Sequence, residues 1–312
     1  MANKLEQRVW LITGANSGLG LAIASYVSSR GDKVIATVRS LDKFPRSLKD
    51  QGASPLVLDL MSPDDEIKLA AEKALQVHGH VDVLVNNAGW GIPSPWEEVD
   101  LNEVRAQFQT MFFGTIAFTQ ALLPHFRTRR TGYVLNVSSL GSFLQPPSWG
   151  AYCSAKAAMS AFTNSLHTEM KPFGVQVLDI LPGYFPTPFM FTAGGKSTYK
   201  PSVVYTDPSQ GYGGPESLHN YHREVGLLGD VGKLAERIFE VVTKTGMAED
   251  LVMKEGQVYD WTMIPLGADT ERAAKEKLVV MLDNINGTEA LWRSVNMDPK
   301  AQKLVPKFTN SA

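Results

Sequence analysis

Val9-Trp10-Leu11-Ile12-Thr13-Gly14-Ala15-Asn16-Ser17-Gly18-Leu19-Gly20 is the stretch that decides the fold. It begins as a short apolar run, which is typical of a buried parallel strand. It then passes through a glycine-rich turn into a helical pattern. Strand, turn and helix in this order place backbone N–H groups and the positive end of a helix against a pyrophosphate. We expect Gly14 to permit the tight turn, Gly18 to let the backbone approach the phosphates and Gly20 to allow close packing. The alternative is a glycine-rich turn with no ligand.

A second stretch, Tyr152-Cys153-Ser154-Ala155-Lys156, carries proton chemistry. On a helix its phenol and its ammonium stand on one face, four residues apart. A phenol titrates near ~10, and a nearby ammonium favours the phenolate, so we expect Lys156 to lower the pKa of Tyr152. Ser139, at the end of the preceding strand, could bind the same oxygen, and the trio could then protonate a carbonyl oxygen. Taken alone, this spacing also fits a surface pair on any amphipathic helix.

Together these motifs resemble the short-chain dehydrogenase/reductase (SDR) family. Three residues separate the first two glycines of the turn, as in that family's Thr-Gly-x-x-x-Gly-x-Gly. Asn86-Asn87-Ala88-Gly89 resembles its Asn-Asn-Ala-Gly signature, and Pro182 to Thr187 resembles its Pro-Gly turn. Ser139 stands thirteen residues before the tyrosine, as the family's catalytic serine does. The resemblance covers about residues 8–267.

The resemblance implies an α/β fold with a Rossmann-like, doubly wound parallel sheet. We expect a three-layer sandwich of about seven strands in the order 3-2-1-4-5-6-7, with the ligand crevice at their carboxyl ends. The later strands are predicted at Lys33–Val38, Leu56–Leu58, Val81–Val85, Gly132–Val137, Val175–Leu181 and Tyr259–Ile264. We predict one domain over residues 1–312, with a core at 8–267, a substrate lid at 188–229 and a C-terminal helical extension at 268–312. That extension resembles family members whose last helix packs back over the domain.

The resemblance also implies roles for individual residues. Ser139, Tyr152 and Lys156 would be catalytic, with Tyr152 as the acid in reduction and Lys156 binding the nicotinamide ribose. The nicotinamide would meet the substrate on the face that delivers the 4-pro-S hydride. The expected cofactor-binding residues are Gly14, Asn16, Ser17, Gly18, Leu19, Gly20, Arg39, Asp59, Leu60, Asn86, Ala88, Gly89, Tyr152, Lys156, Pro182, Gly183, Phe185 and Thr187.

The end of the second strand indicates which cofactor is used. Val38 stands where an acid usually accepts from the ribose 2′-hydroxyl of NAD, and Arg39 follows it. A guanidinium can clamp a 2′-phosphate and stack on adenine, so we predict NADP(H). An arginine that merely ends a strand is the alternative. Asp59 would contact the adenine amino group, although with Ser62 it also suits a helix start.

One position departs from the family pattern. Three residues before Gly114, where the family has an asparagine that props a water near the lysine, this chain has Met111. A thioether cannot reproduce the hydrogen bonds of an amide. Either a backbone carbonyl and another water supply the proton relay, or the site has left hydride chemistry and works as a non-redox isomerase or cyclase. A third hypothesis is a non-catalytic NADP(H)-binding regulator.

The segment from Pro188 to Gly229 has no periodicity, and loops of this length are usually functional. Its aromatic residues and one methionine could line an apolar substrate pocket or could simply pack the lid on the body: Phe189, Met190, Phe191, Tyr199, Tyr205, Tyr212 and Tyr221. The first hypothesis is therefore an NADPH-dependent oxidoreductase that reduces a ketone or aldehyde of a medium-sized apolar substrate, of a secondary-metabolite or polyketide-like kind. We interpret Ser138 as structural and Cys153 as a small filler.

The composition of the chain excludes several other classes of protein. The chain has 312 residues, 44% of them hydrophobic, and a net charge of -2, so no basic field attracts nucleic acid or an anionic membrane. A single cysteine excludes an intrachain disulfide and a multi-thiolate zinc site, and we expect no metal. No stretch approaches the ~20 apolar residues of a membrane span, and we see no signal peptide, so a cytoplasmic location is expected. By resemblance, the long helices Asp100–Arg129 and Ala151–Lys171 would form a homodimer or homotetramer.

Overall fold

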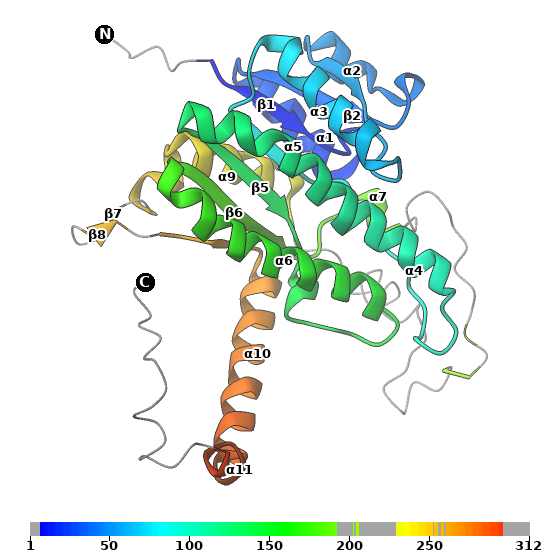
Figure 1. Cartoon of the computed structure of the whole chain (residues 1–312), viewed down its shortest axis with the longest axis vertical. Helices are drawn as coiled ribbons and strands as arrows, with labels where there is room; N and C mark the ends of the chain where they lie inside the picture. The colour runs from blue at the N-terminus through cyan, green and yellow to red at the C-terminus, as the bar shows by residue number, and fades with distance from the viewer. Residues whose placement is uncertain are drawn as a thin grey trace.

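A seven-stranded parallel sheet forms the centre of the molecule (Figure 1). The computed structural model describes residues 7–191, 202, 204–205, 229–251, 253–254, 257–258 and 260–295. The strand order is β3-β2-β1-β4-β5-β6-β9, and all neighbours in it pair in parallel. The predicted doubly wound order is confirmed, with β9 as the seventh strand. The strands are β1 Val9–Ile12, β2 Lys33–Val38, β3 Ser54–Val57, β4 Val83–Asn86, β5 Gly132–Val137, β6 Val175–Pro182 and β9 Met263–Leu266.

Strand boundaries were predicted least well for β3, β4 and β9. β4 begins two residues after the predicted Val81. β3 begins two residues before the predicted Leu56 because it tolerates Pro55, which an edge strand can do. β9, at the other edge, alternates exposed and half-buried residues, so its start was predicted too early, at Tyr259. Tyr259 itself lies outside the described residues. Two further short strands, β7 Met253–Lys254 and β8 Gln257–Val258, pair with each other in antiparallel fashion.

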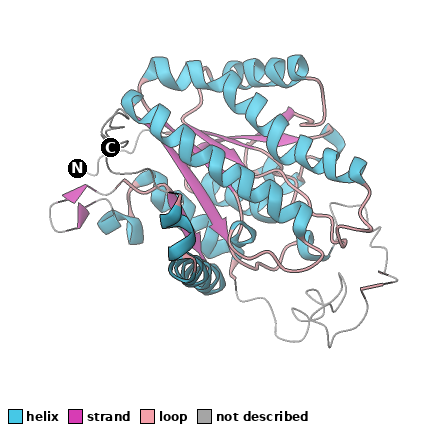
Figure 2. Cartoon of the chain, turned by 60° about the horizontal axis from the view of Figure 1, so that its bottom comes forward, coloured by secondary structure: helices cyan, strands magenta, loops and turns pink. Residues whose placement is uncertain are grey.

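Helices cover both faces of the sheet, as Figure 2 shows. Alternate residues of β1 explain why its run is wholly apolar: Trp10 and Ile12 pack into one buried cluster, and Val9 and Leu11 into the other. The first cluster contains side chains of α1 and α9, and the second contains side chains of α3, α5 and α6. The α-helices are α1 Gly18–Ser29, α2 Arg46–Asp50, α3 Asp64–His78, α4 Leu101–Phe108, α5 Gly114–Arg129, α6 Gly150–Met170, α7 Pro188–Phe191, α9 Val231–Thr243, α10 Ala268–Gly287 and α11 Glu289–Ser294. The short 3₁₀ turns are η1 Leu41–Lys43, η3 Leu140–Ser142, η4 Lys171–Phe173 and η6 Gly246–Leu251.

The long helix predicted from Asp100 to Arg129 is interrupted. Asp100 caps α4 by accepting from the backbone N–H of Asn102 at 2.8 Å. A π-helical turn, η2 Gln109–Phe113, then separates α4 from α5. The Thr115 hydroxyl donates to the Thr110 carbonyl at 3.1 Å, and this satisfies an acceptor at the irregular turn. Such turns gather at functional sites, and this one carries Met111.

Helix α10 begins on the body and then leaves it (Figure 1). Thr270 and Ala273, in its first turns, are buried. Its later apolar residues are exposed, namely Leu278, Val279, Val280, Met281, Leu282 and Ile285. The helix therefore does not pack back over the domain, contrary to the expectation. In the first turn of α10, the Asp269 carboxylate accepts from the backbone N–H of Tyr184 at 2.6 Å.

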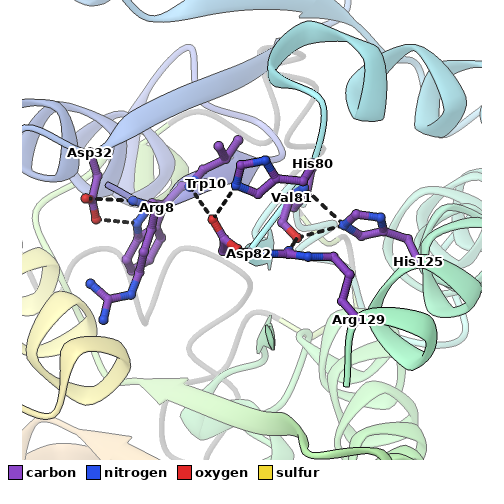
Figure 3. Close-up of polar contacts among 9 residues, drawn as sticks. Arg8, Trp10, Asp32, His80, Val81, Asp82, His125 and Arg129 are labelled. Carbon is purple, nitrogen blue, oxygen red and sulfur yellow. Dashed lines mark hydrogen bonds and ion pairs between the residues drawn. The ribbon is translucent and has the colours of Figure 1, made fainter. Parts of the chain in front are cut away.

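A polar cluster ties the amino ends of the central strands together (Figure 3). Asp82 accepts from the backbone N–H of Val9 at 2.8 Å and from the Arg129 guanidinium at 2.7 Å. Arg129 also donates to the Val81 carbonyl at 2.9 Å, and His80 lies 3.1 Å from the same Asp82 carboxylate. β1, β4 and the end of α5 are thus joined at the edge of the sheet opposite the glycine turn.

Within the part of the chain that the structure describes, no helix is long and apolar enough to cross a membrane.

Candidate active site

The glycine turn packs closely against the end of β4. Gly14 has φ +65°, and a Cβ on it would lie 2.9 Å from Cα of Ala88. A Cβ on Gly20 would lie 2.4 Å from Nδ2 of Asn87 and 2.5 Å from the Gly14 carbonyl. The Thr13 hydroxyl accepts from the backbone N–H groups of Asn87 and Ala88 at 2.9 and 3.0 Å. This fit requires glycine at both positions and fixes the turn at the carboxyl edge of the sheet.

A cavity of about 1040 Å³ opens along this edge. Most of the predicted cofactor-binding residues line it: Gly14, Asn16, Ser17, Gly18, Leu19, Arg39, Asp59, Leu60, Ala88, Gly89, Tyr152, Lys156, Pro182, Gly183, Phe185 and Thr187. Two predicted contacts do not. Gly20 lies beneath the turn, and Asn86 is buried in the sheet, where it donates to Thr119 at 2.9 Å and to Asn136 at 2.8 Å. Its neighbour Asn87 lines the cavity instead, because successive residues of a strand face opposite sides.

Ser139 and Tyr152 meet on the wall of the cavity. Ser139 follows β5 and its hydroxyl is hydrogen-bonded to the Tyr152 phenol. The same hydroxyl accepts from the backbone N–H of Gly141 at 3.0 Å, which fixes its position. α6 carries Tyr152 and Lys156 on one face, with the ammonium 5.8 Å from the centre of the phenol ring. The structure thus brings the three predicted catalytic residues together.

The pKa of Tyr152 moves opposite to the expectation. Burial raises the pKa of the phenol above its usual value, and the hydrogen bond with Ser139 opposes this only in part. Lys156 does not lower it, because the ammonium donates to the Val137 carbonyl at 2.6 Å and is itself deeply buried. Burial lowers the pKa of Lys156 to about 8. Desolvation therefore sets the direction of the pKa shift in both groups.

Met111 occupies the inner end of the site. It is buried, and its Cγ lies 3.6 Å from the point where a Cβ on Gly89 would stand. Lys156 Nζ lies 3.7 Å from the same point. The π-helical turn thus places Met111 beside Gly89 and Lys156, behind the residues that line the cavity.

Aromatic rings enclose Tyr152. Trp149 meets its ring edge-on with centroids 5.8 Å apart, and the Phe189 ring is 5.2 Å away. Leu144, Trp90 and Ile92 continue the apolar wall of the cavity. Of the predicted pocket aromatics, Phe189 lines the cavity and Tyr205 instead donates to Glu97. Tyr199, Tyr212, Tyr221 and the side chains of Met190 and Phe191 lie outside the described residues.

Some of these residues were missed from the sequence. Trp149 stands one helical turn before Tyr152, and that spacing is the signal that could have revealed it. Asp269 is distant in sequence, yet it receives the Tyr184 N–H and holds the Pro-Gly turn; a Cβ on Gly183 would overlap its carboxylate. Ser138 is structural, as interpreted, because it is buried and bonded to Ser142, Ser160 and the Lys156 carbonyl. Burial raises the pKa of the Cys153 thiol to about 12, which suits a filler and not a nucleophile.

The chain is similar to known proteins in sequence and in fold. Residues 8–195 match the family of short chain dehydrogenases. A 3-ketodihydrosphingosine reductase of Bacteroides thetaiotaomicron is 34% identical over 185 residues, which are 59% of this chain and 66% of that protein. A short-chain dehydrogenase from Streptomyces avermitilis superposes with a TM-score of 0.78 at 29% identity, over 95% of this chain and 100% of that one. A 3-ketoacyl-(acyl-carrier-protein) reductase from Brucella melitensis, solved with NADH, superposes with a TM-score of 0.68 at 26% identity, over 86% and 100% of the two chains. The chain therefore belongs to the short-chain dehydrogenase/reductase family of oxidoreductases.

Proposed function

We propose that this protein is an NADPH-dependent reductase that converts a ketone or aldehyde of a medium-sized apolar substrate to an alcohol. The observation that carries the proposal is the hydrogen-bonded pair of Ser139 and Tyr152 at the carboxyl edge of the sheet. A proton donor with a second hydroxyl beside it suits a reacting oxygen atom. The cavity in front of the pair extends along the sheet edge, and residues of the glycine turn line its other part.

The residues of the cavity fit a dinucleotide. Gly14 and Gly18, both at positive φ, line the cavity without side chains, so the turn presents backbone to a ligand there, as a pyrophosphate site requires. Arg39 would hold a 2′-phosphate, Asp59 the adenine, Lys156 the nicotinamide ribose and Thr187 the carboxamide. When bound, NADPH supplies the hydride that reduces the carbonyl carbon. Tyr152 then gives its proton to the carbonyl oxygen, while the Ser139 hydroxyl stabilises the charge that develops there.

The wall around Tyr152 supports an apolar substrate. Trp149 and Phe189 cover the phenol, and Leu144 continues their surface. Such rings exclude water and favour flat or aliphatic groups. The name of the Bacteroides relative, a 3-ketodihydrosphingosine reductase, supports a ketone.

The direct test is transfer of label. Purified protein is incubated with 4-pro-S-deuterated NADPH and a panel of apolar ketones and aldehydes, and the alcohols are analysed by mass spectrometry. We expect deuterium in an alcohol product. Tight NADPH binding without label in any product would contradict the proposal. A product that forms equally well with NADP⁺ would support the isomerase or cyclase alternative.

We expect the substitution Arg39→Ala to weaken NADPH binding about tenfold or more and to leave NADH binding unchanged. Arg39 is exposed at the end of β2 and lines the cavity, so a guanidinium there can form charge-assisted hydrogen bonds with a 2′-phosphate. Fluorescence titration with both cofactors measures the effect. Arg46→Ala, which removes an exposed arginine outside the cavity, is the matched control. Equal losses for NADPH and NADH would show that Arg39 does not read the phosphate.

We also propose a homo-oligomer formed through α10. Leu278, Met281, Leu282 and Ile285 follow the i, i+3, i+4, i+7 spacing of one helix face, and all four are exposed. This stripe is symmetric about its midpoint. A second copy related by a two-fold axis would therefore bring the same residues together, Leu278 against Ile285 and Met281 against Leu282.

We expect light scattering to give more than the 34.2 kDa of one chain. The double change Leu278→Glu with Leu282→Glu should lower that mass, because it places charge in the apolar seam. Val280→Glu alters an equally exposed residue on another side of the helix and serves as the control. If only Phe113→Glu, on the exposed side of η2, dissociates the protein, the interface lies on the long helices instead.

A further inference from the structure

A buried carboxyl group lies behind the active site and has no part in the proposed reaction. Asp179, in the central part of β6, is 2% exposed. One of its oxygens accepts a hydrogen bond from Ser160, and the other, Oδ1, has no hydrogen-bond partner within the described part of the chain. A carboxylate in this setting is costly unless a cation faces it.

The fold positions Lys156 to be the cation that faces Asp179. Lys156 and Ser160 are one turn apart on the inner face of α6, which packs on β6. Asp179 pairs in register with Asn136 of β5, and the next residue of β5, Val137, receives the Lys156 ammonium. Ser160 and the Lys156 main chain are further joined through Ser138, whose hydroxyl lies 2.9 Å from Ser160 Oγ and donates to the Lys156 carbonyl at 3.0 Å.

The electrostatics agree with this placement. Burial raises the pKa of Asp179 to about 6, and the Lys156 charge opposes that rise. Burial lowers the pKa of Lys156 to about 8, and the Asp179 charge opposes that fall. Tyr152 and Cys153 are the other titratable groups next to Lys156 on α6, and burial raises the pKa of both, which keeps them uncharged near neutral pH. His167, farther along α6, contacts the Val177 carbonyl through Nδ1 and the Asp260 carboxylate through Nε2.

Position 111 makes this counter-charge necessary. Met111 offers no strong acceptor to the buried ammonium, and among the described groups Lys156 Nζ donates a hydrogen bond to the Val137 carbonyl alone. We propose that Asp179 is a positioning residue that keeps Lys156 charged from the strand on which α6 packs, in the place of the polar support that Met111 does not provide. The inference rests on the proposed function only for its effect on the rate, because the charge state of Lys156 is measured without turnover.

The test titrates Lys156 directly. Full-length protein labelled with ¹³C-lysine is followed by NMR as the pH is raised, and Lys156→Met identifies the Lys156 signal by its absence. We expect Asp179→Asn to lower the pKa of Lys156 by about one unit or more, since an opposite charge at close range has an effect of that size. Asp260→Asn, which removes a carboxylate that faces Lys171 and His167, should leave the Lys156 signal unchanged.

Two further measurements separate this effect from a structural one. In Asp179→Asn the high-pH limb of the kcat/KM profile should move to lower pH with Lys156, which a merely structural loss would not cause. The melting temperature should fall, because removing one partner leaves the buried Lys156 ammonium without its counter-charge. If Asp179→Asn does not fold, Lys156→Met gives the reciprocal test, in which the pKa of Asp179 should rise. A Lys156 titration that is unchanged in Asp179→Asn, or an Asp179 titration unchanged in Lys156→Met, overturns the proposal. A failed search for turnover would count against the proposed function alone.

Discussion

Replacing Tyr152 with phenylalanine is expected to lower kcat/KM for carbonyl reduction by about 10²- to 10⁴-fold, the usual contribution of a general acid. The change removes the phenolic proton donor and its hydrogen bond with Ser139. It keeps the ring, whose contacts with Trp149 and Phe189 shape the cavity. Steady-state kinetics with NADPH and a substrate found by label transfer measure the loss. The melting temperature should change little.

The control for this prediction is Tyr26→Phe, the same substitution on α1, where the ring packs edge-on against Phe239 away from the cavity. It should keep full activity. NADPH affinity should also stay within a few-fold in Tyr152→Phe, so that the loss falls on kcat. An active Tyr152→Phe enzyme would assign the proton to another donor and would contradict the proposed role of the phenol.

Gly20→Ala is expected to abolish measurable NADPH binding and to destabilise the fold by about 2 kcal/mol or more, as overpacking of a rigid site does. The new Cβ would lie 2.5 Å from the Gly14 carbonyl, and backbone atoms cannot swing aside as a flexible side chain can. It would also push on Asn87, whose amide donates to the Thr13 carbonyl at 2.9 Å. Isothermal calorimetry and chemical denaturation measure the two effects.

Gly287→Ala is the matched control, since nothing lies within 4 Å of the Cβ it would add at the end of α10. It should leave both cofactor affinity and stability unchanged. Normal NADPH binding by Gly20→Ala would mean that the turn can open, and the argument from close packing would then fail.

Patterns that are local in sequence predicted the fold well. The turn from Gly14 to Gly20 needs glycine for reasons of space, and the structure shows those close contacts. The strand order followed from the family resemblance and is confirmed. Ser139, Tyr152 and Lys156 come together as expected, because the end of a parallel strand and the first turns of the next helix meet at one edge of the sheet. Their catalytic roles stay predictions.

Features that depend on contacts between distant residues were not predicted. The π-helical turn at Gln109–Phe113 ends at Gly114, which closely approaches the Leu60 carbonyl, and periodicity reveals neither feature. The raised pKa of Tyr152 follows from burial, which the spacing of two side chains cannot give. Asp179 was read only as part of an apolar strand, although a charged residue within such a strand was a signal that could have been followed.

The tie between Asp82 and Arg129 lies at the amino edge of the sheet, and the cavity lies at the carboxyl edge. This stabilising contact is thus separate from the wall of the proposed substrate site. A directed-evolution library confined to the cavity wall, at Trp149, Phe189 and Leu144, would vary specificity while leaving that clasp intact. Such a scaffold can diversify its chemistry without first acquiring compensatory stabilising mutations.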